Sequence, residues 1–283
     1  MTTGFPLSEP ARAKINLTLH VGPPIGNGYH PLKSVVVFAN IGDIVEMRPA
    51  QGDKSTLVIE GPFANGLASD RTNLILKTAQ LLSDEKFDLK LTKNLPIASG
   101  IGGGSADAAA TTRLIAPENI DQITTDLMAI GADIPVCLRS KTCLMEGKGE
   151  QLTPLPNLGS INAVLVNPGV AVSTGEIFKL FDQTKPTSAN LAVELPNTTD
   201  LMELAKWGRN DLQDVAISIA PEVQTVLDAL SEIETCQLAR MSGSGATCFG
   251  LFSSRDQAVD ACAGIKDENP DWWSVATVLG DTV

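Results

Sequence analysis

The sequence predicts a globular protein of mixed helices and strands, arranged as two domains or as one large domain. Three observations lead to this prediction. The chain has 283 residues, 43% of them hydrophobic and 19% charged, as in proteins that fold around a large core. Segments that alternate like strands are interspersed with segments of helical periodicity. Proline and glycine punctuate them, with a plausible domain boundary at residues 154–159.

The composition argues against several classes of partner and site. A formal net charge of -12 disfavours nucleic acid and anionic membranes as partners. The first ten residues lack the basic and apolar regions of an export signal, and no apolar run could span a bilayer, so we expect a cytoplasmic protein. Five cysteines without a CxxC pair indicate reduced thiols, and the only histidines, His20 and His30, leave few ways to build a metal site or a triad.

The most informative stretch is residues 93–115. It follows a predicted strand over residues 87–91, where apolar and polar side chains alternate. Four glycines then occupy five positions, 100 to 104, and leave backbone amides open to a ligand. We expect Ser105 to be the N-cap of an alanine-rich helix over 106–116, which Pro117 ends.

A glycine-rich loop that leads into a helix N-terminus favours phosphate binding, because the amides and the helix dipole both attract anions. An ordinary strand-to-helix turn is the alternative. The Rossmann pattern fails because Ser105 stands where it needs glycine, and the Walker pattern fails because no Gly-Lys-Ser/Thr occurs. Asp107 suits the helix dipole but would repel phosphate, unless it points away or contacts a metal ion. Lys14, Lys93 and Lys148 are candidates to offset the negative net charge locally.

Three other segments carry candidate chemistry. Residues 11–21 alternate as a strand, with Lys14 and Asn16 on the second face, where a lysine is usually solvated. The turn over residues 26–30 carries Tyr29, the only tyrosine, which could pack or stack on a nucleobase. Asp133 follows a helix predicted over 120–130, and is either a turn aspartate or a catalytic carboxylate.

The remaining segments predict scaffold. Residues 34–47 are interpreted as two strands joined by a turn at Gly42 and Asp43, and residues 73–82 as a helix. Ser173 and Glu176 form a capping box before another helix. Residues 239–252 are two strands joined by residues 242–245, which form a hairpin turn or a second phosphate-facing loop.

Six segments, in the right order and spread over nearly the whole chain, resemble the GHMP kinase superfamily, which includes homoserine, mevalonate and galactose kinases. They are AKINL (13–17), GYH (28–30), LPIASGIGGGSADAA (95–109), GADIPV (131–136), PGVAVSTGEIF (168–178) and SGSGA (242–246). AKINL and GYH resemble the members that act on 4-diphosphocytidyl-2-C-methyl-D-erythritol. The pattern departs from the superfamily at Arg12, where proline is usual, and at Ala98 and Ser99, which replace glycines.

The resemblance implies an α+β fold with two domains, 1–156 and 157–283, and an active site in the cleft between them. It implies ATP-dependent phosphorylation of the 2-hydroxyl of the cytidine substrate, which gives the 2-phosphate and ADP in the non-mevalonate route to isoprenoids. Two alternatives stay open: a kinase for another small alcohol such as homoserine, and a nucleotide sensor without turnover. Small molecules are the expected partners of a monomer or weak homodimer.

The resemblance also assigns roles to residues. Lys14 and Asp133 are implied to be the catalytic pair, and Ser105 to contact Mg²⁺. The segment that wraps the ATP phosphates comprises Pro96, Ile97, Ala98, Ser99, Gly100, Ile101, Gly102, Gly103, Gly104, Ser105 and Ala106, with Asn73 and Lys93 near the adenosine. The implied cytidine-substrate contacts are Asn16, Tyr29, His30, Thr174 and Phe178.

Overall fold

The computed structural model describes residues 5–118, 120–156 and 158–281. It divides into two compact units, each assembled from separate segments. Unit 1 contains the chain up to residue 13 and residues 41–97 and 102–140, and unit 2 contains residues 14–40, 98–101 and the chain from residue 141. Both units use residues from before position 156, so they do not coincide with the expected domains 1–156 and 157–283, and that division stays a prediction.

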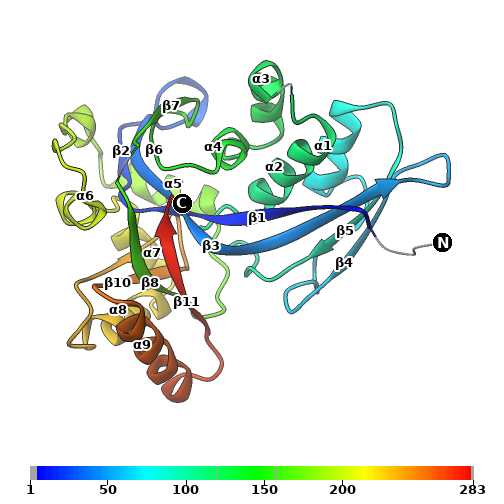
Figure 1. The fold of residues 1–283 in the computed structure, drawn as a ribbon. Helices are drawn as coiled ribbons and strands as arrows, with labels where there is room; N and C mark the ends of the chain where they lie inside the picture. Colours follow the sequence, from blue (N-terminus) through cyan, green and yellow to red (C-terminus); the bar gives the residue numbers. More distant parts are fainter. Residues whose placement is uncertain (1–4, 119, 157, 282–283) are drawn as a thin grey trace. The chain divides into compact units, whose positions relative to one another are not determined.

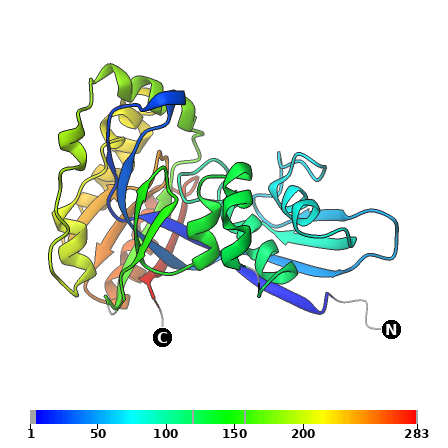
Figure 2. The ribbon, with the colours of Figure 1, turned by 90° about the horizontal axis from the view of Figure 1, so that it is seen from above.

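Unit 1 combines a small sheet with four helices. Strand β4 (Thr56–Glu60) pairs in parallel with β5 (Phe87–Thr92), and β5 pairs antiparallel with the second half of β3 (Leu32–Pro49). The helices pack together on one face of this sheet (Figures 1 and 2). They are α1 (Leu74–Leu82), α2 (Gly103–Ile115), α3 (Ile120–Ile130) and α4 (Ile134–Arg139). The alternation predicted for β5 is confirmed, because its burial alternates along the strand.

The prediction of two strands and a turn over residues 34–47 is wrong, because β3 is one strand of 18 residues. Gly42 does not turn the chain. A Cβ at Gly42 would lie 2.1 Å from the carbonyl oxygen of Ala11, so glycine permits β1 (Leu7–Asn16) to approach β3 closely. Asp43 does not turn the chain either. It is fully buried in unit 1, where its carboxylate accepts a hydrogen bond from the amide of Asn94.

Unit 2 is built on an antiparallel sheet in the order β11, β8, β10, β9. These strands are Trp273–Gly280, Ser160–Asn167, Cys248–Phe252 and Leu238–Met241. Helices α8 (Glu222–Ser231) and α9 (Arg255–Glu268) pack on it (Figure 1). The hairpin predicted over residues 239–252 is confirmed by the pairing of β9 with β10.

The other elements of unit 2 extend this core. The first half of β3 pairs with β2 (His20–Val21) and with β6 (Cys143–Gly147), which pairs in turn with β7 (Gln151–Pro154). The helical elements are η1 (Gly26–Gly28), α5 (Thr174–Gln183), η2 (Ser188–Leu191), α6 (Leu201–Trp207) and α7 (Gln213–Ile219). The capping box predicted at Ser173 is supported, because its hydroxyl accepts from the amide of Glu176 at 3.4 Å. Within the described part of the chain, no helix has the length and apolar character needed to cross a membrane.

Candidate functional site

The glycine-rich segment contains three residues at positive φ. Ala98 has φ 50°, Gly100 has φ 75° and Gly102 has φ 67°. Glycine takes these values without strain, whereas alanine at position 98 costs about 1 kcal/mol. Gly100 is also required for a close approach, since a Cβ there would lie 2.5 Å from the carbonyl oxygen of Ser242. The positive φ angles and this close approach therefore fix the backbone of the segment. Along it, Ile101 is buried and Ile97 is exposed.

Helix α2 begins three residues earlier than predicted, at Gly103, and Ser105 is not its N-cap. The N-cap is Gly102 in the left-handed conformation, and no side chain caps the helix. The local reason is that glycine at 102 permits the sharp turn into the helix. The first amide with an intrahelical partner is that of Ala106, which donates to the carbonyl of Gly102 at 2.8 Å. The amides of residues 103–105 thus have no intrahelical acceptor and suit an anion.

Asp133 lies beside this helix start in unit 1. Helices α2 and α4 pack together, and the Ser105 hydroxyl lies 3.6 Å from where a Cβ on Gly131 would stand. Asp133 is at the N-cap position of α4, yet its side chain makes no capping hydrogen bond. A capping role is thereby excluded, and both interpretations of Asp133, as a turn aspartate and as a catalytic carboxylate, stay predictions. Unit 1 brings together an uncapped helix start, a serine hydroxyl and the turn that carries Asp133.

A buried ionic cluster lies next to the same helix. The ammonium of Lys93 is 2.5 Å from the carboxylate of Asp43 and 2.8 Å from that of Asp107. Their side chains are 3%, 0% and 5% exposed. One carboxylate oxygen of Asp107 thus contacts Lys93, while its buried Oδ1 has no hydrogen-bond partner within the described residues. Burial is the main cause that raises the pKa of Asp107; Lys93 opposes this rise and the Asp43 carboxylate adds to it.

Asn73, implied to lie near adenosine, caps helix α1. Its side-chain oxygen accepts from the amide of Ile75 at 3.0 Å, and its side-chain nitrogen donates to the carbonyl of Ala68 at 2.8 Å. Each end of the side-chain amide thus has a partner in unit 1. The ammonium of Lys93 is likewise bonded to carboxylates. The roles of both residues toward a nucleotide stay predictions.

Unit 2 gathers Lys14 and Asn16 around the first half of the glycine-rich segment. The amide of Lys14 donates to the carbonyl of Ile101 at 2.9 Å. The amide of Asn16 donates to the hydroxyl of Ser242 at 3.1 Å, and that hydroxyl donates to the carbonyl of Gly100 at 3.2 Å. Lys14 is only 4% exposed, so the expectation of a solvated lysine drawn from the strand pattern is wrong. Burial of a lysine costs free energy unless its ammonium is hydrogen-bonded or paired with a negative charge.

The turn between β9 and β10 is more than a hairpin connection, because it contacts the glycine-rich segment within unit 2. The amide of Thr247 donates to the carbonyl of Ser99 at 3.1 Å. A Cβ at Gly243 would lie 2.6 Å from the carbonyl oxygen of Gly100. Asn210 supports the turn, since its side-chain nitrogen donates to the carbonyls of Met241 and Gly243 at 2.8 and 2.9 Å. Nothing around Asn210 in the sequence indicated this role.

Two residues expected to bind cytidine lie together in unit 2. The imidazole of His30 stacks on the ring of Phe178, with centroids 4.8 Å apart and planes at 28°. The Nε2 atom of His30 is 2.7 Å from the carboxylate of Asp182, a residue that the sequence did not single out. Thr174, Phe178 and Asp182 recur every four residues along α5, which places them on one helix face. Helical spacing from Phe178 was the signal that could have found Asp182.

Tyr29 and Thr174 complete the set expected at the cytidine end. Tyr29 is 52% exposed, and the ammonium of Lys148 lies over its ring, 4.8 Å from the centroid. An exposed tyrosine at a turn is free to receive a planar ligand. The hydroxyl of Thr174 is 2.8 Å from that of Ser244 in the β9–β10 turn. Asn16 donates to the hydroxyl of Ser34 at 2.8 Å, while its buried side-chain oxygen has no hydrogen-bond partner within the described residues.

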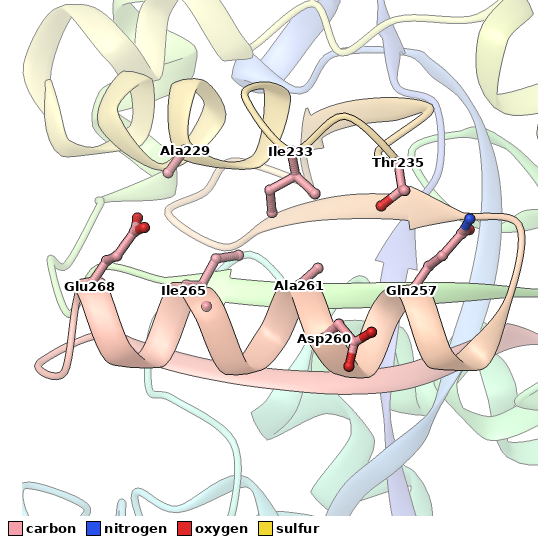
Figure 3. Close-up of a pocket in the computed structure, with 9 residues that line it drawn as sticks. Ala229, Ile233, Thr235, Gln257, Asp260, Ala261, Ile265 and Glu268 are labelled. Carbon is pink, nitrogen blue, oxygen red and sulfur yellow. The ribbon is translucent and has the colours of Figure 1, made fainter.

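A separate pocket of about 330 Å³ lies between α9 and the end of α8 (Figure 3). Gln257, Ala261, Ile265 and Glu268 of α9 point toward Ala229 and Ile233 in this view. Among the described residues that line the pocket none is lysine or arginine, and two, Asp260 and Glu268, are acidic. It is therefore poorly suited to a phosphorylated ligand, and none of the predicted site residues lines it.

The predicted site residues are divided between the units. Unit 1 contains Asp133, Asn73, Lys93, residues 96–97 and residues 102–106, and unit 2 contains Lys14, Asn16, residues 98–101 and the expected cytidine contacts. Contacts join only some of these residues: Ser105 approaches the turn at Gly131 in unit 1, and in unit 2 Lys14 bonds Ile101 and His30 stacks on Phe178. The distance between Lys14 and Asp133 stays a prediction.

Two family models match the chain, "GHMP kinases N terminal domain" over residues 73–144 and "GHMP kinases C terminal" over residues 191–271. A 4-diphosphocytidyl-2-C-methyl-D-erythritol kinase of Roseobacter denitrificans is 45% identical over 279 residues, which cover 95% of this chain and 92% of that protein. The chain belongs to the GHMP kinase family. The α+β fold expected from the sequence is thereby confirmed.

Solved structures of GHMP kinases agree with this membership. A crystal structure of 4-(cytidine 5'-diphospho)-2C-methyl-D-erythritol kinase superposes with a TM-score of 0.78 at 27% identity, and covers 98% of this chain and 100% of its own. A homoserine kinase from Cytophaga hutchinsonii gives a TM-score of 0.65 at 16% identity, with 100% and 96% covered. Because the homoserine kinase is only 16% identical, its similarity shows a shared fold and nothing about the substrate. The resemblance inferred from short motifs thus extends over the whole chain.

Proposed function

We propose that this chain transfers the γ-phosphoryl group of ATP to the 2-hydroxyl of 4-diphosphocytidyl-2-C-methyl-D-erythritol, giving the 2-phosphate and ADP in the non-mevalonate route to isoprenoids. The observation that carries the proposal is the uncapped start of α2 at Gly103, beside the turn that holds Asp133. Amides for a phosphate and a carboxylate for a hydroxyl lie in the same unit. The named relatives support the choice of acceptor.

The ATP phosphates bind along residues 96–106 in this proposal. The amides of residues 103–105 have no intrahelical acceptor, and the α2 dipole favours negative charge at the same place. Phosphoryl transfer passes through a loose transition state, so positioned amides contribute by holding the transferring group and its charge. The open backbone at Gly103 and Gly104 allows the phosphate to approach closely.

Asp133 orients the acceptor hydroxyl and receives its proton as the new phosphorus–oxygen bond forms. Lys14 stabilises the oxygens of the transferring group through its positive charge. The burial of Lys14 supports its role, because a charge interacts more strongly where water is excluded. The orientation of the hydroxyl matters more than base strength in such a reaction.

The residues present fit a Mg²⁺ ion that arrives with the nucleotide. Among the described residues, no group of three or more histidine, cysteine, aspartate or glutamate side chains could hold a metal ion on its own. Mg²⁺ commonly binds through phosphates, waters and one or two side-chain oxygens, and the Ser105 hydroxyl in the first turn of α2 is suited to this. Held there by Ser105, the ion would supply positive charge to offset that of the terminal phosphates.

The cytidine moiety binds in unit 2. Tyr29 and Phe178 offer aromatic faces for cytosine, and His30, held by Asp182, offers a hydrogen bond to its edge. Asn16 and Thr174 add polar contacts to the rest of the substrate. A homoserine kinase would not need two aromatic side chains and a histidine in its acceptor site, and this favours the cytidine substrate over homoserine. Lys14 and Asp133 are both present, which weighs against a sensor without turnover.

A comparison of acceptors tests the proposal. The purified chain is incubated with ATP, Mg²⁺ and one of three alcohols: the cytidine substrate, methylerythritol 4-phosphate without the nucleotide, or homoserine. ADP release is the measurement. We expect rapid release only with the cytidine substrate. Equal rates with homoserine would replace the proposal by the first alternative, and no release with any alcohol would replace it by the sensor.

A further inference from the structure

The buried cluster of Asp43, Lys93 and Asp107 joins the two ends of the glycine-rich segment. Asp43 lies on β3, Lys93 directly follows β5, and Asp107 lies in the second turn of α2. All three belong to unit 1. The segment that leads into the loop and the helix that follows it are therefore fixed to one strand through side chains that are almost fully buried.

The carboxylate of Asp43 bonds both Lys93 and the backbone at the start of the loop. Its Oδ1 accepts from the amides of Asn94 and Leu95 at 2.6 and 2.9 Å, immediately before Pro96. Its Oδ2 accepts from Lys93. The side chain of Asn94 adds a hydrogen bond to the carbonyl of Gly42 at 3.0 Å. A single carboxylate thus sets the path of the backbone at the position where the loop begins.

Asp107 holds the end of the loop. Its Oδ2 accepts from the ammonium of Lys93, which ties the start of α2 to residues 93–95. Gly103 lies against this tie, since a Cβ there would be 3.1 Å from the ammonium and 3.7 Å from Asp43. The amides that carry the proposed phosphate site are therefore next to the cluster, although the cluster itself is buried beneath them.

We propose that Asp43, Lys93 and Asp107 form a positioning network that preorganises the glycine-rich segment for the ATP phosphates. The inference rests on the proposed function, because it assigns that segment to ATP. It adds that the network acts through backbone position, with Asp43 and Asp107 making no contact to the nucleotide. Preorganisation of this kind lowers the cost of binding, and small displacements of the backbone weaken it.

Two substitutions at Asp107 separate positioning from general stability. Asp107→Asn keeps an oxygen that can accept from Lys93, whereas Asp107→Leu keeps the branching of the side-chain heavy atoms but cannot accept. Asp107→Leu leaves one carboxylate for one ammonium, so the buried charges stay paired and the thermal midpoint should not fall. A purely structural role for Asp107 predicts the opposite, a loss of stability with no specific effect on ATP.

The experiment measures ATP binding by calorimetry, together with the thermal midpoint and the KM values for both substrates. We expect Asp107→Leu to weaken ATP binding by about tenfold or more, an effect typical of a displaced positioning group, with the KM for the alcohol unchanged. Asp107→Asn should bind ATP within about twofold of the wild type, by the same reasoning. Asp43→Ala should weaken ATP binding further, because the amides of Asn94 and Leu95 also lose their acceptor.

Unchanged ATP affinity in a folded Asp107→Leu protein would overturn the inference, as would equal losses in the Asn and Leu variants. These outcomes differ from a failure of the proposed function. In that case the wild type itself would bind no ATP, or would bind ATP normally and fail to phosphorylate the cytidine substrate. The calorimetric comparison needs no turnover, so it tests the network even where the acceptor has been assigned wrongly.

Discussion

The two compact units hold their parts of the glycine-rich segment by different means. Unit 1 uses buried charges, with Lys93 between Asp43 and Asp107. Unit 2 uses neutral hydrogen bonds, in which the Ser242 hydroxyl donates to the carbonyl of Gly100 and Asn210 holds the turn that contains Ser242. A charged network fixes position strongly but depends on the balance of charge, whereas a neutral one depends on each donor having an acceptor.

This difference suggests a division of labour. The charged network lies beneath amides proposed to bind a highly charged ligand, where position decides affinity. The neutral network lies in the unit that contains the expected cytidine contacts. We therefore expect substitutions in unit 1 to weaken the binding of ATP, and substitutions in unit 2 to weaken the binding of the cytidine substrate. The proposed catalytic pair, Lys14 and Asp133, is the exception, since one member belongs to each unit.

The largest effect is expected at that pair. Lys14→Met and Asp133→Asn should each lower kcat by about a hundredfold or more, because each removes a group that acts in the transition state. ATP should still raise the thermal midpoint of both proteins. Near wild-type turnover in either variant would remove that residue from the pair. An effect in only one variant would place the chemistry in one unit.

Phe178→Ala sharpens the comparison in unit 2. Loss of the ring removes a stacking face and the support of His30, so the KM for the cytidine substrate should rise by about tenfold, a typical loss for base stacking. The KM for ATP should stay within about twofold, since Phe178 is not among the residues proposed to bind ATP. Steady-state kinetics with each substrate varied in turn measures both. A matching rise in the KM for ATP would contradict the division.

Asn210→Leu tests the neutral network through stability. The change leaves the carbonyls of Met241 and Gly243 and the amide of Leu212 without their side-chain partner, which should lower the free energy of unfolding by about 2 kcal/mol. Denaturant unfolding gives the value. Asn190→Leu is the matched control, because the Asn190 side chain donates to the carbonyl of Val21 in a half-buried site and should cost about 1 kcal/mol or less. Equal costs would mean that Asn210 has no special role.

The smallest effect is expected at His20, which lies 5.2 Å from Trp207 and has no hydrogen-bond partner for either ring nitrogen within the described residues. Burial, followed by nearby Arg209, lowers the pKa of His20 below 6.5, while Asp211 opposes this. The unfolded chain therefore takes up the proton first as the pH falls through 6.5, and stability decreases below that pH.

His20→Phe should remove this part of the acid sensitivity. The measurement is the free energy of unfolding at about pH 8 and about pH 5 for both proteins, a range that spans the titration of histidine. The difference between the two pH values should be smaller in the variant. An unchanged difference would show that other groups dominate the acid response of this region.

Local patterns predicted most elements correctly, because most elements follow local rules. The alternation over β5 and the capping box before α5 both appear as expected. The start of α2 was missed because Ser105 has the highest N-cap preference, yet Gly102 can turn the chain three residues earlier. The continuity of β3 was missed because Gly42 and Asp43 are typical turn residues, and their use for a close strand approach and a buried ion pair depends on distant segments.

The site was predictable where it follows short motifs. The glycine-rich segment was named from the sequence, and His30 and Phe178 were each named as expected cytidine contacts, although the stacking of one ring on the other was not predicted. The supporting residues were not, because Asp43, Asp182 and Asn210 act through contacts more than 25 residues away in the chain. Asp43 accepts from an amide 51 residues away. Such partners are set by tertiary structure, and of the three supporting residues only Asp182 had a local signal, its helical spacing from Phe178.

Phosphorus NMR of the reaction mixture tests the central claim most directly. With ATP, Mg²⁺ and the cytidine substrate, we expect the γ-phosphate signal to be replaced by ADP signals and by one new phosphomonoester signal coupled to carbon 2 of the methylerythritol. Inorganic phosphate with an unchanged alcohol, or a phosphomonoester on another carbon, would contradict the account.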